Sequence, residues 1–362
     1  MPQAHELSAG DHSNNTQAGR DAVQAGHDVI QPRGDVYQFG LTYDQARQLT
    51  LDVFEANFLR MVGAAGDLVR DRVEQFIRDY LDQLQAVNPS ALSGVQDPDV
   101  LKSIYVAQEG FARSGEEDLE KVLVDLLVDR TQQQDRELKA LVLNEAIAAL
   151  PRLSMKQRKS IAAIFIVRYT RRTQLSPLPD YYALLTKWLS PFIEMLSDRR
   201  ADYEHIQSTG VGALSVVMWE LNQSFAENAR GFFTDGFDLD VVPEDFRQHL
   251  SDGQIFIKCI RNPSKIQINA ASEQELPAIA AAKNLDLGQL EQLSKNGSMS
   301  HSEIQEDLVT HVPEMRRVYE LWDAKHSAVK VFELTSAGKA IGHSYWQQVT
   351  GEKISPLDIW LA

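Results

Sequence analysis

The spacing of apolar residues is the feature that most constrains what this chain can fold into. Between residues 42 and 86 they recur mostly at intervals of three, four and seven, as at Val53, Phe54, Val73, Phe76 and Leu84. That spacing places them on one face of an amphipathic helix. Thr42-Tyr43-Asp44-Gln45 is typical of a helix-starting capping box. The pattern therefore predicts one long helix, which we interpret as a stalk.

The same periodicity continues through the middle of the chain. It predicts helices over residues 97–111, 116–132, 136–150, 154–170 and 178–196. A further helix is expected to open at Gly210-Val211-Gly212 and to carry Val216, Val217 and Trp219. Together these segments predict a helical body over residues 41–235.

The pattern changes after Gly236. Residues 255–260 and 265–269 are strand candidates, with a turn at Asn262-Pro263-Ser264 between them, and residues 329–334 form a third candidate. Helical segments separate these strands, and a closing helix is expected over residues 336–349. The pattern predicts a small α+β domain over residues 236–362.

A short repeat with a period of seven precedes the helical body. Three copies begin at Gln17, Gln24 and Gln31, and each combines glycine, aspartate and a mostly apolar pair. A coiled coil would need strong helix formers, which glycine and aspartate are not. Turn-forming Gly and Asp beside strand-forming Val and Ile instead favour a β-solenoid or a β-prism. The predicted fold class is therefore mainly α, with a short N-terminal β-solenoid or β-prism repeat and a small C-terminal α+β domain.

Three copies make only about one turn of such a structure, which would leave unpaired strand edges. We therefore expect residues 17–40 to assemble with other copies of the chain, after a flexible segment over residues 1–16. Two alternatives stay open: a disordered tail with fortuitous self-similarity, and a calcium-binding repeat. The residues expected to carry the assembly are Gln17, Gly19, Asp21, Val23, Gln24, Gly26, Asp28, Val29, Ile30, Gln31, Gly34, Asp35, Val36 and Tyr37.

Charge and composition limit the classes of partner. The 362 residues carry a formal net charge of −15, which repels nucleic acid and anionic lipid at long range. A single cysteine, Cys259, cannot form an intramolecular disulfide and fits a reducing compartment. The first residues lack an apolar leader core, and the longest apolar run, residues 161–167, is too short to span a bilayer. We expect a cytoplasmic protein without membrane contact.

One stretch reverses the overall charge. Residues 146–179 contain no aspartate or glutamate. Its cations either pair with the acidic segment around Glu116 and Asp118, which we favour, or bind an anionic partner such as nucleic acid. These candidate anion-binding residues are Arg152, Lys156, Arg158, Lys159, Arg168, Arg171 and Arg172.

No motif with catalytic or metal-binding spacing is present. The sequence has no P-loop and no His-Glu-x-x-His, and the adjacency of Glu204 and His205 to Ser208 does not make a triad. We therefore assign no catalytic residue, no metal ligand and no cofactor, and favour a protein that is not an enzyme.

Several short segments together resemble a known group of sequences. The Gln-Ala-Gly-Arg-Asp repeat, residues 40–43 and 51–58, and later pieces over 126–130, 143–147 and 334–338 are similar to an uncharacterised family of bacterial cytoplasmic proteins. No established activity follows from that resemblance. The repeats also resemble N-termini of proteins loosely associated with anti-phage defence, which is analogy alone.

These observations favour an interaction, scaffold or sensor protein that forms a homo-oligomer through its N-terminal repeat and binds a protein partner. The alternative is a nucleic-acid-binding regulator that uses the basic helix over residues 154–172. A second alternative is a hydrolase whose site the sequence does not identify.

Overall fold

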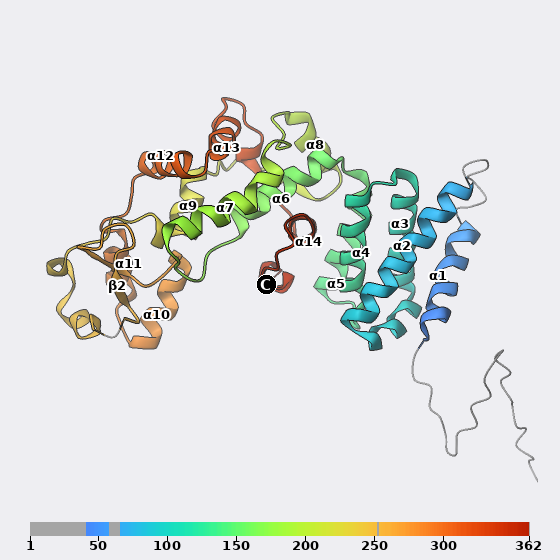
Figure 1. Cartoon of the computed structure of the whole chain (residues 1–362), viewed down its shortest axis with the longest axis horizontal. Helices are drawn as coiled ribbons and strands as arrows, with labels where there is room; N and C mark the ends of the chain where they lie inside the picture. Colours follow the sequence, from blue (N-terminus) through green and yellow to red (C-terminus); the bar gives the residue numbers. More distant parts are fainter. Residues whose placement is uncertain (1–40, 58–65, 252, 362) are drawn as a thin grey trace, which may run out of the picture. The chain divides into compact units, whose positions relative to one another are not determined.

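The computed structural model describes residues 41–57, 66–251 and 253–361, and these are mainly helical (Figure 1). The first half of the described chain is almost wholly helix and turn, as the apolar spacing predicts. The α-helices of the described residues are α1 (Tyr43–Asn57), α2 (Gly66–Val87), α3 (Pro98–Ser114), α4 (Glu117–Thr131), α5 (Leu138–Ala149), α6 (Met155–Tyr169), α7 (Leu178–Ile193), α8 (Arg200–Ser208), α9 (Leu221–Asn228), α10 (Leu276–Lys283), α11 (Leu287–Lys295), α12 (His301–His311), α13 (Met315–Trp322) and α14 (Ser336–Thr350).

The strands of the described residues form two small antiparallel sheets. β1 (Gly212–Leu214) pairs with β4 (Phe332–Leu334), and β2 (Phe256–Lys258) pairs with β3 (Ile266–Ile268). The predicted fold class is therefore wrong in its β part, because no β-solenoid or β-prism occurs among these residues. The repeat itself, residues 17–40, lies outside the described residues. The corrected class is mainly helical with two short sheets.

Local sequence signals explain where several helices begin. Thr42 and Gln45 form the predicted reciprocal pair, with the Thr42 amide donating to Gln45 Oε1 at 3.0 Å and the Gln45 amide donating to Thr42 Oγ1 at 3.3 Å. Ser154 and Gln157 form a complete capping box at the start of α6. These side chains satisfy amide groups that the first helical turn leaves unpaired.

The predicted stalk is two helices instead of one. α1 and α2 are separate segments that lie side by side and both contact α3 (Figure 1). Phe54 from α1 and Phe76 from α2 are both buried. The Tyr43 hydroxyl also donates to Asp82 Oδ1 at 2.9 Å, which ties the start of α1 to α2. The apolar face that suggested a stalk is instead used within the helical body.

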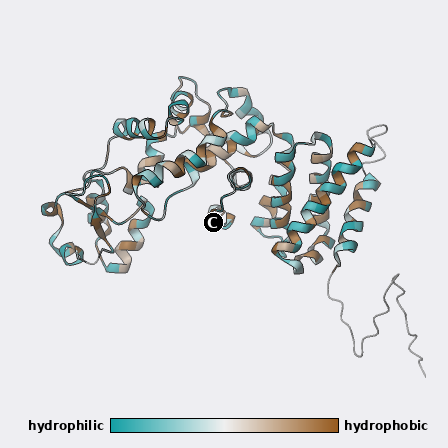
Figure 2. Cartoon of the chain, in the orientation of Figure 1, coloured by the Kyte–Doolittle hydropathy of each residue, from teal (hydrophilic) through white to brown (hydrophobic). Residues whose placement is uncertain are grey.

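The C-terminal helix α14 lies in the core of that body. It contacts α4, α5, α6 and α7, and its residues from Ala337 to Trp346 are nearly all buried. Most other helices show one apolar and one polar face, visible as alternating brown and teal in Figure 2. A helix buried all round needs small residues where neighbours come close, and α14 supplies Gly338 and Gly342. The helix predicted to close a C-terminal α+β domain thus packs in the large core.

A smaller second core contains only the middle part of the predicted C-terminal domain. Its buried residues run from Phe237 to Leu293, whereas Ile304, Trp322 and Leu357 pack into the large core with α14. β1, which precedes residue 236 in the chain, pairs directly with β4, which follows it. The predicted boundary at residue 236 thus separates segments that share a core.

Gly210 and Gly212 have a different role from the one predicted. Instead of opening a helix, they lead into β1, where Gly212 pairs with Leu334. A Cβ atom on Gly212 would lie 2.3 Å from the Phe332 ring, so this strand pair needs glycine. The Val216–Met218 segment that follows is exposed and precedes α9.

The close approach at Gly338 gives a stability prediction. In α14, Gly338 lies against the backbone of residue 211, and a Cβ atom there would be 2.0 Å from the Val211 carbonyl oxygen. Gly338→Ala should therefore lower the free energy of unfolding by about 1–3 kcal/mol, although alanine normally stabilises helices. Urea denaturation measures this. Gly66→Ala is the control, since nothing lies within 4 Å of its added methyl group. Equal or greater stability of Gly338→Ala would contradict this packing.

A buried carboxylate gives a pH prediction. Glu120 is nearly fully buried, and burial, together with the charge of Asp79, raises its pKa to about 7. Because the pKa is raised on folding, the contribution of Glu120 to stability is present at acidic pH and is lost as pH rises through 7. Because glutamine does not ionise, Glu120→Gln should not lose stability as pH rises. It should be more stable than the wild-type protein by on the order of 2 kcal/mol above pH 7.5.

Thermal unfolding of both proteins between pH 4 and pH 8 measures this difference. The gain should be small near pH 4.5 and should grow as pH rises. The exposed Glu55 in α1 provides the control Glu55→Gln, which should follow the wild-type curve. A constant difference between wild type and Glu120→Gln across this range would show that Glu120 does not titrate as stated.

Candidate functional site: an anion-accepting cavity at the end of α6

The acid-free stretch forms α6 and the segments on either side of it, and most of its cations are used internally. Arg158 is only 1% exposed and forms ion pairs with Glu116 and, at 3.1 Å, with Asp118. Burial opposes its charge, but these two carboxylates raise the pKa of Arg158. Tyr345 of α14 donates to the same Asp118 carboxylate at 2.9 Å. Arg158 thus forms the pairing with the acidic segment that the sequence analysis favoured.

Other cations of the stretch also have partners within the chain. Lys156 lies 3.7 Å from Asp198 and 3.8 Å from Asp202. Arg168 donates to the Phe332 carbonyl oxygen and lies 4.6 Å from the centre of the Trp219 ring. These residues hold α6 against its neighbours and are not free for an external ligand.

The remaining predicted cations are not brought to one place. Arg152 is exposed and lies 3.5 Å from the Ser208 carbonyl oxygen, while Lys159 is half-buried. Arg171 and Arg172, by contrast, follow the end of α6 and line two neighbouring cavities. The structure therefore selects these two arginines from the seven candidates.

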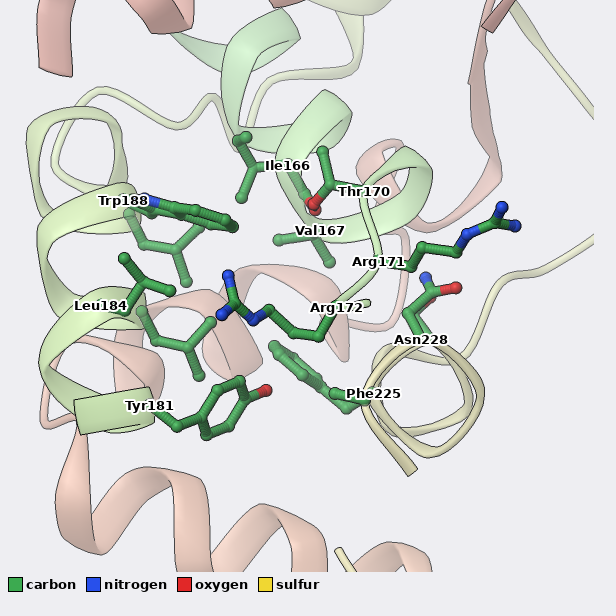
Figure 3. A pocket seen from close by; sticks show the side chains of 14 residues that line it. Ile166, Val167, Thr170, Arg171, Arg172, Tyr181, Leu184, Trp188, Phe225 and Asn228 are labelled. Atoms are coloured by element: carbon green, nitrogen blue, oxygen red, sulfur yellow. The ribbon is translucent and has the colours of Figure 1, made fainter. Parts of the chain in front are cut away.

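The inner cavity lies where α6, α7 and α9 meet. It has a volume of about 40 Å³, and Figure 3 shows the Arg172 guanidinium pointing into it between Trp188 and Tyr181. Arg171 points away from this group of side chains in the same view. The Arg172 amide donates to the Asn228 carbonyl oxygen at 3.1 Å, which fixes the segment after α6 against the end of α9.

Three of the side chains that line the inner cavity carry a buried polar atom without a hydrogen-bond partner. These atoms are Arg172 Nε, Trp188 Nε1 and Ser224 Oγ. Ser224 is only 2% exposed. An unsatisfied buried polar group costs about 1–3 kcal/mol, so three around one small cavity call for an explanation. All three can donate a hydrogen bond.

The charge of the inner cavity is positive and uncompensated by the chain. The Arg172 guanidinium lies 5.7 Å from the centre of the Trp188 ring, and no carboxylate is among the residues that line the cavity. Burial raises the pKa of the neighbouring Tyr181, and the charge of Arg172 opposes that rise. The cavity therefore combines one cation with neutral donors in an apolar surrounding.

An outer cleft of about 420 Å³ shares Thr170, Arg171, Arg172 and Trp188 with the inner cavity. The end of the chain supplies its other wall, which includes Lys353, Ile354, Ile359 and Trp360. The indole nitrogen of Trp360 donates to the Tyr169 carbonyl oxygen and attaches this wall to the end of α6. The cleft thus extends the inner cavity with both cationic and apolar groups.

A second polar cluster elsewhere lines a hollow of about 550 Å³ but is saturated internally. Both oxygens of Asp307 accept from Arg261 at 2.7 Å, and the Tyr182 hydroxyl donates to the same carboxylate at 2.6 Å. Burial alone would raise the pKa of Asp307, but these hydrogen bonds hold it below its usual value. This cluster ties α7 and α12 to the β2–β3 region.

Sequence reasoning found the two arginines but missed the rest of the site. Trp188 lay in the helix predicted over residues 178–196, to which no functional role was assigned, and nothing in the sequence distinguished Ser224 or Lys353. The predicted assembly residues between Gln17 and Tyr37 all lie outside the described residues. Within the described ranges, no three His, Cys, Asp or Glu side chains gather in a way that could hold a metal ion, and no helix has the length and apolar character needed to cross a membrane.

A family model whose description reads only ":-like" matches residues 40–361. The match covers nearly all of the described chain, and the description names no activity, ligand or partner. No curated protein and no solved structure matches the chain.

The buried Arg158 network gives a test of the internal role of α6. Arg158→Met removes the cation that pairs with Glu116 and Asp118 and should lower the free energy of unfolding by about 1–3 kcal/mol, since both carboxylates stay partly exposed to water. The neighbouring half-buried Lys159 provides the matched control Lys159→Met, which should change stability by less than about 0.5 kcal/mol. Urea denaturation of both variants measures the difference. Similar stability of the two variants would argue against the buried pairing.

Proposed function

The chain belongs to the family whose model matches residues 40–361, and for this member we propose the binding of a small anionic ligand at Arg172. The observation that carries the proposal is the set of unpartnered donors around the inner cavity, Arg172 Nε, Trp188 Nε1 and Ser224 Oγ. A bound oxyanion would remove the cost of all three and neutralise the guanidinium charge. Ligand binding without chemistry is compatible with the sensor role expected from the sequence.

The residues that line the two cavities support binding more than catalysis. Neither lining contains a carboxylate, a histidine or a cysteine, so the described site offers no ready general base or activated nucleophile. The hydrolase alternative therefore gains no candidate residue here. The outer cleft, at about 420 Å³, falls within the range of small-molecule sites.

The nucleic-acid alternative loses residues on which it depended. Lys156, Arg158 and Arg168 are occupied by partners within the chain. Arg171 and Lys353 are exposed cations beside the outer cleft, but two such cations provide a small footprint for a phosphate backbone. A small ligand fits the observed geometry better.

The proposal keeps the sensor role from the functions expected from the sequence. A bacterial cytoplasmic setting, a role in defence, self-association and a protein partner stay predictions. Assembly through a β-repeat over residues 17–40 is no part of the proposal, because the fold class on which it depended is wrong.

Replacing Arg172 tests the proposal. Small anions such as acetate or inorganic phosphate, compared with chloride at constant ionic strength, should raise the melting temperature of the wild-type protein and change Trp fluorescence. An anion at 100 times its dissociation constant would stabilise by about 2.7 kcal/mol. Arg172→Met should abolish both effects, because it removes the only cation seen pointing into the inner cavity.

The control is Arg152→Met, which replaces an exposed arginine that lines neither cavity. It should keep the response to anions. Arg172→Met should itself fold normally, since it replaces a side chain whose Nε has no partner. Absence of any anion effect on the wild type, or an unchanged effect in Arg172→Met, would overturn the proposal.

A further inference from the structure

We infer that the inner cavity selects a carboxylate, and that the ligand is a monocarboxylate whose aromatic or short aliphatic tail extends along the outer cleft. This inference rests on the proposed function and specifies its ligand class. It draws on the charge of the inner cavity, its donors and size, and the residues it shares with the outer cleft.

The charge balance favours a single negative charge. One guanidinium, that of Arg172, points into the inner cavity, and the other two unpartnered donors, on Trp188 and Ser224, are neutral. A carboxylate brings one charge and would be neutralised. A phosphate monoester brings about 1.5 to 2 charges at neutral pH and would need a second cation, whereas Arg171, which also lines the cavity, points away from it.

The size and donor geometry point the same way. A volume of about 40 Å³ corresponds to room for roughly three water-sized spheres, since each needs about 10–15 Å³. A carboxylate has two oxygens with about four acceptor sites, which can take hydrogen bonds from Arg172, Trp188 and Ser224 together. A tetrahedral phosphate is larger than a carboxylate and would fill more of this small volume.

The walls of the inner cavity are largely apolar. Val167 from α6, Leu185 and Leu189 from α7, and Phe225 from α9 line the inner cavity beside the donors. Such walls disfavour a second polar group at this depth. They leave the carboxylate as the only polar part of the ligand inside the inner cavity.

The rest of the ligand has a defined direction. Because Thr170, Arg172 and Trp188 line both spaces, the two are neighbours, and the ligand that we infer extends from the inner cavity toward the outer cleft. There it meets Ile354 and Trp360, whose apolar surfaces can cover a ring or a short alkyl chain. The structure thus matches a carboxylate with an apolar tail.

Isothermal titration calorimetry on the full-length protein tests the inference with matched probes. Benzoate and hexanoate carry a carboxylate on an aromatic or an aliphatic tail. Phenylphosphate keeps the ring of benzoate but replaces the carboxylate, and benzyl alcohol removes the charge. We expect benzoate or hexanoate to bind at least tenfold more tightly than phenylphosphate, and benzyl alcohol to show no measurable heat.

Two conservative variants test the individual donors. Ser224→Ala and Trp188→Phe each remove one unpartnered donor and keep most of the packing. Each should weaken carboxylate binding by about three- to tenfold, the usual effect of one lost hydrogen bond, without weakening phenylphosphate equally. Ser224→Ala should leave the melting temperature unchanged or raise it, because alanine is the better helix former in α9. The exposed Ser302 in α12 provides the control Ser302→Ala, which should leave carboxylate binding unchanged.

The outcomes separate the two proposals. Tighter binding of the carboxylates, weakened by Ser224→Ala and Trp188→Phe, supports both. Binding of phenylphosphate as tight as benzoate and dependent on Arg172 overturns the carboxylate inference and leaves the anion site standing. Binding of carboxylates that ignores both donor variants also overturns the inference. Failure of the carboxylates, phenylphosphate, acetate and inorganic phosphate alike to bind overturns the inference together with the proposed function.

Discussion

The close packing of α14 against α6 is the constraint on which the rest of the large core depends. A Cβ atom on Gly342 would lie 2.6 Å from the Cβ atom of Phe165, so the two helices approach closely only because position 342 is glycine. α14 also contacts α4, α5 and α7, and Tyr345 joins the ion-pair network of Arg158 and Asp118. Apolar packing and buried charge pairing therefore fix the position of α6 together.

The position of α6 in turn defines the candidate site. With α6 held by α14, its C-terminal end lies beside α7 and α9, and the chain leaves the helix at Thr170 into the space between them. Arg168, one turn earlier, donates to the Phe332 carbonyl oxygen and lies over the Trp219 ring. No carboxylate is among the residues that line the cavity into which Arg172 points. The same helix thus supplies cations paired within the chain along its length and is followed by the cation at which we propose ligand binding.

The charge pattern of the sequence was informative but not sufficient. An acid-free stretch in a chain of net charge −15 indicates that its cations need partners from elsewhere. Arg158 finds them in Glu116 and Asp118, more than 35 residues away, while Arg172 finds none among the residues that line its cavity. Both arginines have similar neighbours in sequence, so only their burial and their contacts distinguish the paired Arg158 from Arg172, for which we propose a binding role.

The sequence by itself determined the local elements. Apolar spacing located most helices, the Thr42–Gln45 capping box set the start of α1, and strand residues flanking Asn262 formed β2 and β3, because these signals act between residues close in the chain. Only the tertiary structure decided that α14 enters the large core, that β1 pairs with β4, and that Ser224 and Trp188 join Arg172. Such contacts depend on how surfaces that are distant in the sequence fit together. A glycine can allow two helices to pack closely, and a buried donor can be left without a partner. Local sequence patterns do not encode that fit.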